Sequence, residues 1–137
     1  MAASKGRLRV NVDGGARGNP GPAAVAAVVQ DGSGEVLEER SEAIGTATNN
    51  VAEYRALLLG IERAAALGAK RLELIGDSEL IVRQVKGEYK VKDEALRELH
   101  LQVREALDGF EDWSIRHVRR DDNAEADRLV NEELDRL

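Results

Sequence analysis

The chain has 137 residues, of which 42% are hydrophobic and 34% charged, and its net charge is −6. This composition suits a globular chain that buries one core, and it excludes an intrinsically disordered protein and a globally basic nucleic-acid binder. Because cysteine is absent, disulfide scaffolds and thiolate metal sites are excluded, and carboxylates or the two histidines must hold any metal, which favours Mg²⁺ or Mn²⁺.

The first six residues are short and polar, which predicts a flexible tail at residues 1–6. The chain length predicts a single domain at residues 7–137. No apolar run approaches the roughly 18 residues of a membrane span, and no signal-peptide core is recognisable. We therefore expect a cytoplasmic protein that has no membrane partner and is a monomer.

The first half of the predicted domain begins with three strands. Residues 8–13 alternate between apolar and polar, which predicts a strand that ends at Asp13 on its polar face. The segment GGARGNPGP at 14–22 is too rich in Gly and Pro for regular structure, and an apolar second strand at 23–29 completes a hairpin. A turn at 31–34 then leads to a weaker third strand from 36 to about 44, whose charged residues are typical of a sheet edge.

A helix is predicted from Asn50 to Gly68, with Asn49 or Asn50 as its cap. A short apolar strand at 72–75 follows, closed by Gly76 and Asp77, and Ser78 caps a brief helix through Val85.

After a basic connector at 86–92, the pattern predicts a helix over 96–107 and a strand over 113–118. A last helix runs from about Asn123, with Asp121 or Asp122 as its cap. The order of these elements predicts an α/β fold in which a five-stranded mixed sheet, three antiparallel strands and then parallel strands, is flanked by helices.

Four acidic residues occupy positions from which they can converge. Asp13 and Asp77 follow strands, where ligand sites of α/β sheets gather, and Glu53 and Asp127 lie in the first turns of two helices. Clustered carboxylates repel one another unless a cation neutralises them, and two Mg²⁺ ions, or Mn²⁺, suit phosphodiester hydrolysis. The alternative, that these acids only cap helices or face solvent, stays open because the chain has 26 acidic residues.

Four motifs carry a resemblance that spans nearly the whole chain. They are DGGARGNPGPAA at 13–24, TNNVAEY at 48–54, GDSELIV at 76–82 and NAEADRLV at 123–130. Together they resemble the type 1 ribonuclease H family, in a compact form without the basic handle of longer bacterial members. The resemblance implies a ribonuclease H-like fold and an endonuclease that hydrolyses the RNA strand of RNA/DNA hybrids with two metal ions, leaving 5′-phosphate and 3′-hydroxyl ends. It also implies four catalytic, metal-binding acids, namely Asp13, Glu53, Asp77 and Asp127.

The same resemblance implies contacts with the hybrid. The predicted substrate-binding residues are Gly14, Gly15, Asn19, Thr48, Asn49, Asn50 and Asn123. Contacts to the DNA strand are predicted for Lys86, Tyr89, Lys90 and Lys92, with Tyr89 at a place where relatives often have Trp. Ordinary alternatives stay open, namely helix capping for Asn49 and Asn50, turn formation for Asn19 and the glycines, and a solvated connector for the lysines.

The chain also departs from the family pattern. Many relatives have a histidine in the loop before the last acid, and here that loop reads VRRDDN, where Arg119 and Arg120 are candidates to steer phosphate. Thr46 stands where arginine is common. We expect His100 and His117 to be packing or surface residues. The competing functions are a non-catalytic hybrid-binding module and a nuclease of the same fold that acts on other nucleic acids, such as double-stranded RNA.

Overall fold

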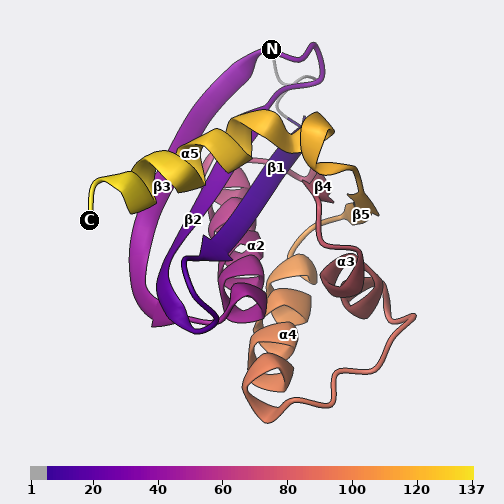
Figure 1. Ribbon diagram of the computed structural model, residues 1–137. Helices are drawn as coiled ribbons and strands as arrows, with labels where there is room; N and C mark the ends of the chain where they lie inside the picture. The colour runs from indigo at the N-terminus through magenta and orange to yellow at the C-terminus, as the bar shows by residue number, and fades with distance from the viewer. Residues whose placement is uncertain (1–5) are drawn as a thin grey trace.

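The fold is organised around a five-stranded sheet with the order β3-β2-β1-β4-β5 (Figure 1). The computed structural model describes residues 6–137. Residues 1–5 of the predicted tail therefore lie outside the described residues. The strands are β1 (Arg7–Ala16), β2 (Gly21–Gln30), β3 (Val36–Ala47), β4 (Arg71–Gly76) and β5 (Asp112–His117). The first three pair antiparallel, and β4 pairs parallel with both β1 and β5, which confirms the predicted mixed sheet and the edge position of β3.

Helices cover both faces of this sheet. They are α2 (Asn49–Ala66), α3 (Glu79–Lys86), α4 (Glu94–Leu107) and α5 (Ala124–Asp135), with a 3₁₀ turn, η1 (Arg120–Asn123), before α5. In Figure 1, α5 crosses one face of β2 and β3, whereas α2 and α4 lie on the other. No helix in the described part of the chain has both the length and the apolar character needed to cross a membrane.

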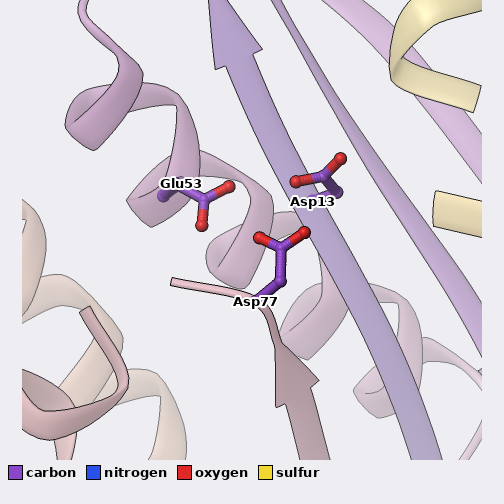
Figure 2. Close-up of side chains that lie close together, drawn as sticks. All are labelled: Asp13, Glu53 and Asp77. Atoms are coloured by element: carbon purple, nitrogen blue, oxygen red, sulfur yellow. The ribbon is translucent and has the colours of Figure 1, made fainter. Parts of the chain in front are cut away.

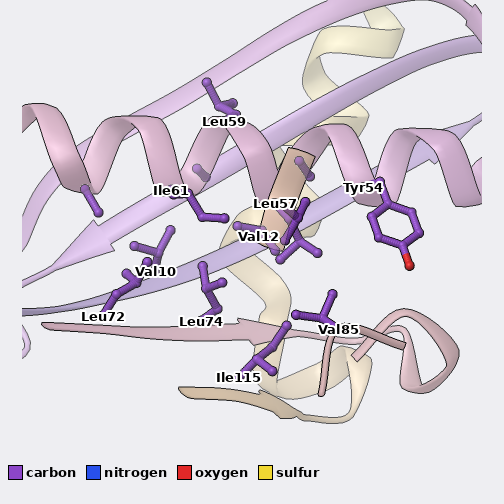
Figure 3. Packing of buried hydrophobic residues seen from close by; sticks show 14 of the residues in the cluster. Val10, Val12, Tyr54, Leu57, Leu59, Ile61, Leu72, Leu74, Val85 and Ile115 are labelled. Atoms are coloured by element: carbon purple, nitrogen blue, oxygen red, sulfur yellow. The ribbon is translucent and has the colours of Figure 1, made fainter. Parts of the chain in front are cut away.

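Strand β2 is buried on both faces, which explains its uninterrupted apolar sequence. Val25, Ala27 and Val29 join the larger core under α2, which Figure 3 shows, and the residues between them join a smaller core under α5. Within the larger core the buried Tyr54 hydroxyl donates a hydrogen bond of 2.6 Å to the side chain of Gln84. The two cores hold β1 and β2 rigidly in the middle of the molecule.

Strand β1 extends beyond its predicted end at Asp13. Its parallel pairing with β4 stops at Asn11, opposite Ile75, but its antiparallel pairing with β2 continues to Ala16. Both glycines at 14 and 15 are therefore strand residues, and the irregular loop shrinks to residues 17–20, with a cis peptide bond before Pro20. Asp13 thus lies within a strand, at the level where the neighbouring β4 has just ended.

The helix starts differ in part from the predicted ones. Thr48, not Asn49 or Asn50, caps α2, because its hydroxyl accepts a hydrogen bond from the Val51 amide at 3.2 Å. Ser78 caps α3 as predicted. The prediction that Asp121 or Asp122 caps the last helix is wrong, since both lie inside η1 and α5 begins without a side-chain cap.

Gly14 is required by the close approach of α2 to β1. A Cβ atom at this position would lie 2.2 Å from the backbone oxygen of Ala52, whereas at Gly15 the nearest atom, on Val130, would be 3.9 Å away. The close approach at Gly14 brings the first turns of α2, including Glu53, against the strand that carries Asp13.

We predict that Gly14→Ala and Gly15→Ala have opposite outcomes, although the two residues are adjacent. Gly14→Ala should lower the free energy of unfolding by about 3 kcal/mol or more, because backbone atoms must move to admit the methyl group. Gly15→Ala should change it by less than about 1 kcal/mol, because its surroundings are open and alanine suits a strand better. Urea unfolding of both variants measures the difference, and equal stabilities would contradict this account of the β1–α2 contact.

Candidate active site

Three carboxylates converge beyond the end of β4 (Figure 2). Asp13 comes from β1, Glu53 from the start of α2 and Asp77 from the residue after β4. One carboxylate oxygen from each lies within 4.8 Å of the other two. The predicted convergence of these three side chains therefore takes place in the structure.

The fold holds each of the three in place by a separate contact. Parallel pairing aligns β1 with β4, so that Asp77 leaves the sheet beside Asp13. Glu53 is oriented by the backbone N–H of Gly14, which donates a hydrogen bond of 2.7 Å to its Oε1. Gly14 thus both allows the close approach of α2 and orients the Glu53 carboxylate.

Asp127 lies farther out than the other three acids. It is not part of the close group, but it lines the same hollow, of about 510 Å³, and its charge raises the pKa of both Asp13 and Asp77. One turn further along α5, the Asn131 amide donates to the backbone oxygen of Asp127 at 3.1 Å. The four predicted acids therefore face one hollow, three at close range and one at its wall.

Burial and repulsion hold protons on this cluster. Burial first, and then the charges of Glu53, Asp77 and Asp127, raise the pKa of Asp13 to about 9. Burial raises the pKa of Glu53 to about 7 against the opposing hydrogen bond from Gly14. The pKa of Asp77 is also raised by burial, although the charge of Arg120 and the amide of Asn123 counteract the effect.

The cluster fits a hard divalent cation. Asp77 Oδ2 is buried and has no hydrogen-bond partner among residues 6–137, which is costly unless another group or an ion satisfies it. Carboxylate oxygens are the ligands that Mg²⁺ prefers, and a bound cation would offset the repulsion that now favours the protonated acids.

Comparison with known proteins places the chain in a family. The model of the family described as "Reverse transcriptase-like" matches residues 11–133. A crystal structure of ribonuclease H1 from Halobacterium salinarum superposes with a TM-score of 0.94 at 48% identity, covering 96% of this chain and 100% of that one. The chain belongs to the type 1 ribonuclease H family.

Other relatives differ in length. The chain is 48% identical over 130 residues to the full ribonuclease HI of H. salinarum, covering 95% of this chain and 65% of that protein. It is 44% identical to a bifunctional protein of Mycobacterium tuberculosis, covering 94% of this chain and 36% of the relative. A crystal structure of LC11-RNase H1, which was isolated from compost, in complex with an RNA/DNA hybrid has a TM-score of 0.89 at 42% identity and covers 94% of this chain and 97% of that one.

The asparagines near the start of α2 join it to the β1–β2 loop. The side-chain oxygen of Asn19 accepts a hydrogen bond of 2.9 Å from the backbone N–H of Asn49. The side-chain oxygen of Asn49 in turn accepts one of 2.9 Å from the backbone N–H of Ala16. Gly14, Gly15, Asn49 and Asn50 line the acidic hollow, and Asn19, Thr48 and Asn50 line a smaller hollow of about 240 Å³ beside it. Their placement suits the predicted contacts, which stay predictions.

Asn123 is placed differently from a surface contact residue. Its side chain is in the interior, 2% exposed, where its amide donates to the Val12 carbonyl at 2.8 Å and its oxygen accepts from Asn11 at 3.0 Å. These bonds tie η1 to β1 and set the position from which α5 starts. The predicted RNA contact stays a prediction.

Of the predicted DNA-strand residues, Lys86 ends α3, and Tyr89, Lys90 and Lys92 lie on the connector between α3 and α4. Lys86, Lys90 and Lys92 are exposed, and Tyr89 is 47% exposed with the guanidinium carbon of Arg83 5.5 Å from its ring centre. None of the four lines the acidic hollow. All four are exposed away from the hollow, and their contact with DNA stays a prediction.

The two histidines lie outside the acidic hollow. His100 packs edge-on against Tyr54 and contacts the Gln84 carbonyl at 3.0 Å, as expected of a packing residue, and His117 ends β5. Sequence reasoning missed Arg17, Ser78 and Asn131, which line the hollow. Only the spacing of Asn131, one helical turn after Asp127, was a usable signal.

We predict that the metal-free protein loses stability as pH rises through the neutral range. The pKa values of Asp13 and Glu53 lie above their ordinary values of 3.8 and 4.5, so between about pH 4 and pH 9 the folded protein binds more protons than the unfolded chain. In EDTA, Tm should fall by about 3 °C or more between about pH 5.5 and pH 8.5. Asp13→Asn should flatten this fall, and the same slope in both proteins would contradict the assignment.

We predict that Asn11 and Asn123 contribute to stability as one unit. Asn123→Ala should cost about 2 kcal/mol or more, because it leaves the Val12 carbonyl unpaired in the interior. Asn11→Ala should cost about 1 kcal/mol alone and close to nothing once Asn123 is alanine. Chemical unfolding of the two single variants and the double variant tests this, and strictly additive losses would show that the pair is not coupled.

Proposed function

We propose that the protein is an endonuclease that hydrolyses the RNA strand of RNA/DNA hybrids. The observation that carries the proposal is the convergence of Asp13, Glu53 and Asp77 within 4.8 Å, with Asp127 at the wall of the same hollow. The family membership supports this substrate, because the relative LC11-RNase H1 was solved with an RNA/DNA hybrid.

In this proposal the four acids hold two divalent cations, Mg²⁺ or Mn²⁺. Bound cations of this kind polarise a phosphoryl oxygen and lower the pKa of water, which is the chemistry needed for hydrolysis without a covalent enzyme intermediate. Asp13 has the central place among the ligands, since its pKa responds to the charge of each of the other three acids. The expected products have 5′-phosphate and 3′-hydroxyl ends.

The remaining residues of the hollow orient the ligands and the nucleic acid. The Gly14 amide fixes the Glu53 carboxylate, and Asn131 contacts Asp127, so two of the ligands are held before substrate binds. Arg120 acts electrostatically on Glu53 and Asp77 and supplies positive charge where a phosphate must approach an acidic surface. Asn49 and Asn50 offer short polar groups for the ribose 2′-hydroxyl that distinguishes RNA from DNA.

The test is cleavage of an end-labelled RNA/DNA hybrid in Mg²⁺ or Mn²⁺, with DNA and RNA duplexes in parallel. We expect internal cuts in the RNA strand of the hybrid. Asp13→Asn should lower the cleavage rate by more than about a hundredfold. Loss of a residue that only hydrogen-bonds to a metal ligand already lowers metal affinity or activity roughly 10-fold to 100-fold, and Asp13 is proposed to be a ligand itself. Asp112→Asn is the matched control, since Asp112 is exposed at the far end of β5.

The possible results separate the competing functions. Full activity of Asp13→Asn would contradict the site, and specific hybrid binding without cleavage in either metal would indicate a non-catalytic binding module. Cuts in the RNA duplex at a rate similar to the hybrid would broaden the substrate to double-stranded RNA.

A further inference from the structure

The acidic hollow needs positively charged side chains along its walls if it is to accept a phosphate backbone. Its lining residues include four acids and two arginines, Arg17 and Arg120. Arg120 faces the close carboxylate group, because its charge lowers the pKa of both Asp77 and Glu53. Arg17, in contrast, forms an ion pair of 2.6 Å with Asp135, in the last turn of α5. The two arginines therefore serve different parts of the hollow.

The backbone of Arg17 is fixed, although its side chain is not. Its amide donates to the Pro22 carbonyl at 2.8 Å, and the preceding Ala16 amide donates to Asn49, so the loop is attached to both β2 and α2. The side chain of Arg17 is 49% exposed and that of Asp135 is 67% exposed. Ion pairs this exposed contribute little stability, so the guanidinium changes partners at small cost.

We propose that Arg17 is a nucleic-acid-binding residue, which Asp135 holds in the free protein and which moves to a backbone phosphate of the bound hybrid. A guanidinium binds phosphate oxygens as it binds carboxylate oxygens, so Asp135, which accepts one hydrogen bond from Arg17, occupies the place of the phosphate. The inference rests on the proposed function, because it requires that the hollow accept a hybrid.

The phosphate bound by Arg17 is not the one that reacts. The hollow follows α5 from Asp127 to Leu134, a distance of about 10 Å at the rise of an α-helix, which is about three times the axial spacing of phosphates along one strand. Asp135, at the far end of this stretch, marks where the Arg17 guanidinium lies. Arg17 therefore raises the affinity for the hybrid and helps to fix its position along α5, and it takes no part in the chemical step.

The test is hybrid binding, measured by fluorescence anisotropy in Mg²⁺ with every variant built on Asp13→Asn to prevent cleavage. Arg17→Ala should weaken binding about fivefold to tenfold and lower the slope of log affinity against log salt by about one. Asp135→Asn should strengthen binding about twofold to fivefold, and this gain should vanish when Arg17 is alanine. A purely structural ion pair predicts no gain from Asp135→Asn that depends on Arg17.

Two control variants separate this effect from general charge. Arg128→Ala removes an exposed α5 arginine that does not line the hollow, and Glu132→Gln removes an α5 charge that is paired with Arg128 instead of Arg17. The inference is overturned if Arg17→Ala matches Arg128→Ala, or if Asp135→Asn weakens binding or only matches Glu132→Gln. If the parent protein fails to bind hybrid at all, the proposed function fails, and this inference fails with it.

In the cleavage-competent protein the same contact predicts a kinetic signature. Arg17→Ala should raise KM by a factor similar to its loss of affinity and leave kcat within about twofold, because the contact is equally present in the ground state and the transition state. A fall in kcat with unchanged KM would overturn the assignment of Arg17 to a phosphate that does not react.

Discussion

The mutual repulsion of three closely packed carboxylates, one buried and two partly buried, is the constraint on which the arrangement of this protein depends. Asp13, Glu53 and Asp77 are held within 4.8 Å although their burial and charges oppose it. Two backbone contacts hold the carboxylates together. Parallel pairing aligns β4 with β1, and close packing at Gly14 places the start of α2 against β1. The apolar cores on both faces of β2 supply the stability that such a site lacks. A bound cation would offset this repulsion, so the same arrangement would favour cation binding.

Much of the fold could be predicted because the deciding signals are local. The alternation in β1, the apolar run of β2 and the charged residues of β3 reflect how each strand is buried, and the motifs placed the acids in the correct elements. The end of β1 could not be predicted, because a glycine pair usually indicates a turn and only contact with α2 explains Gly14. The cap of α2 was likewise assigned one residue too late, since Thr48 and Asn49 both suit that role locally.

The site was predictable in its acids and much less in what surrounds them. Asp127 carries the same motif signal as the other three acids, yet it lies outside their close group, a difference that depends on where α5 starts. That start is set by the buried contact of Asn123 with Asn11, which joins residues 112 positions apart in the chain. The pairing of Arg17 with Asp135 spans 118 positions and is equally invisible to local patterns. Long-range polar contacts thus shape a hollow that the four motif acids line.

The central claim is that a divalent cation takes the place of protons on this carboxylate cluster, and calorimetric titration with Mg²⁺ in buffers of different ionisation enthalpy tests it most directly. Near neutral pH the account predicts binding accompanied by release of about one proton, because the pKa of Asp13 is raised to about 9 and that of Glu53 to about 7. Asp13→Asn should bind Mg²⁺ more weakly and release fewer protons. Binding without proton release, or unchanged binding in Asp13→Asn, would contradict the account.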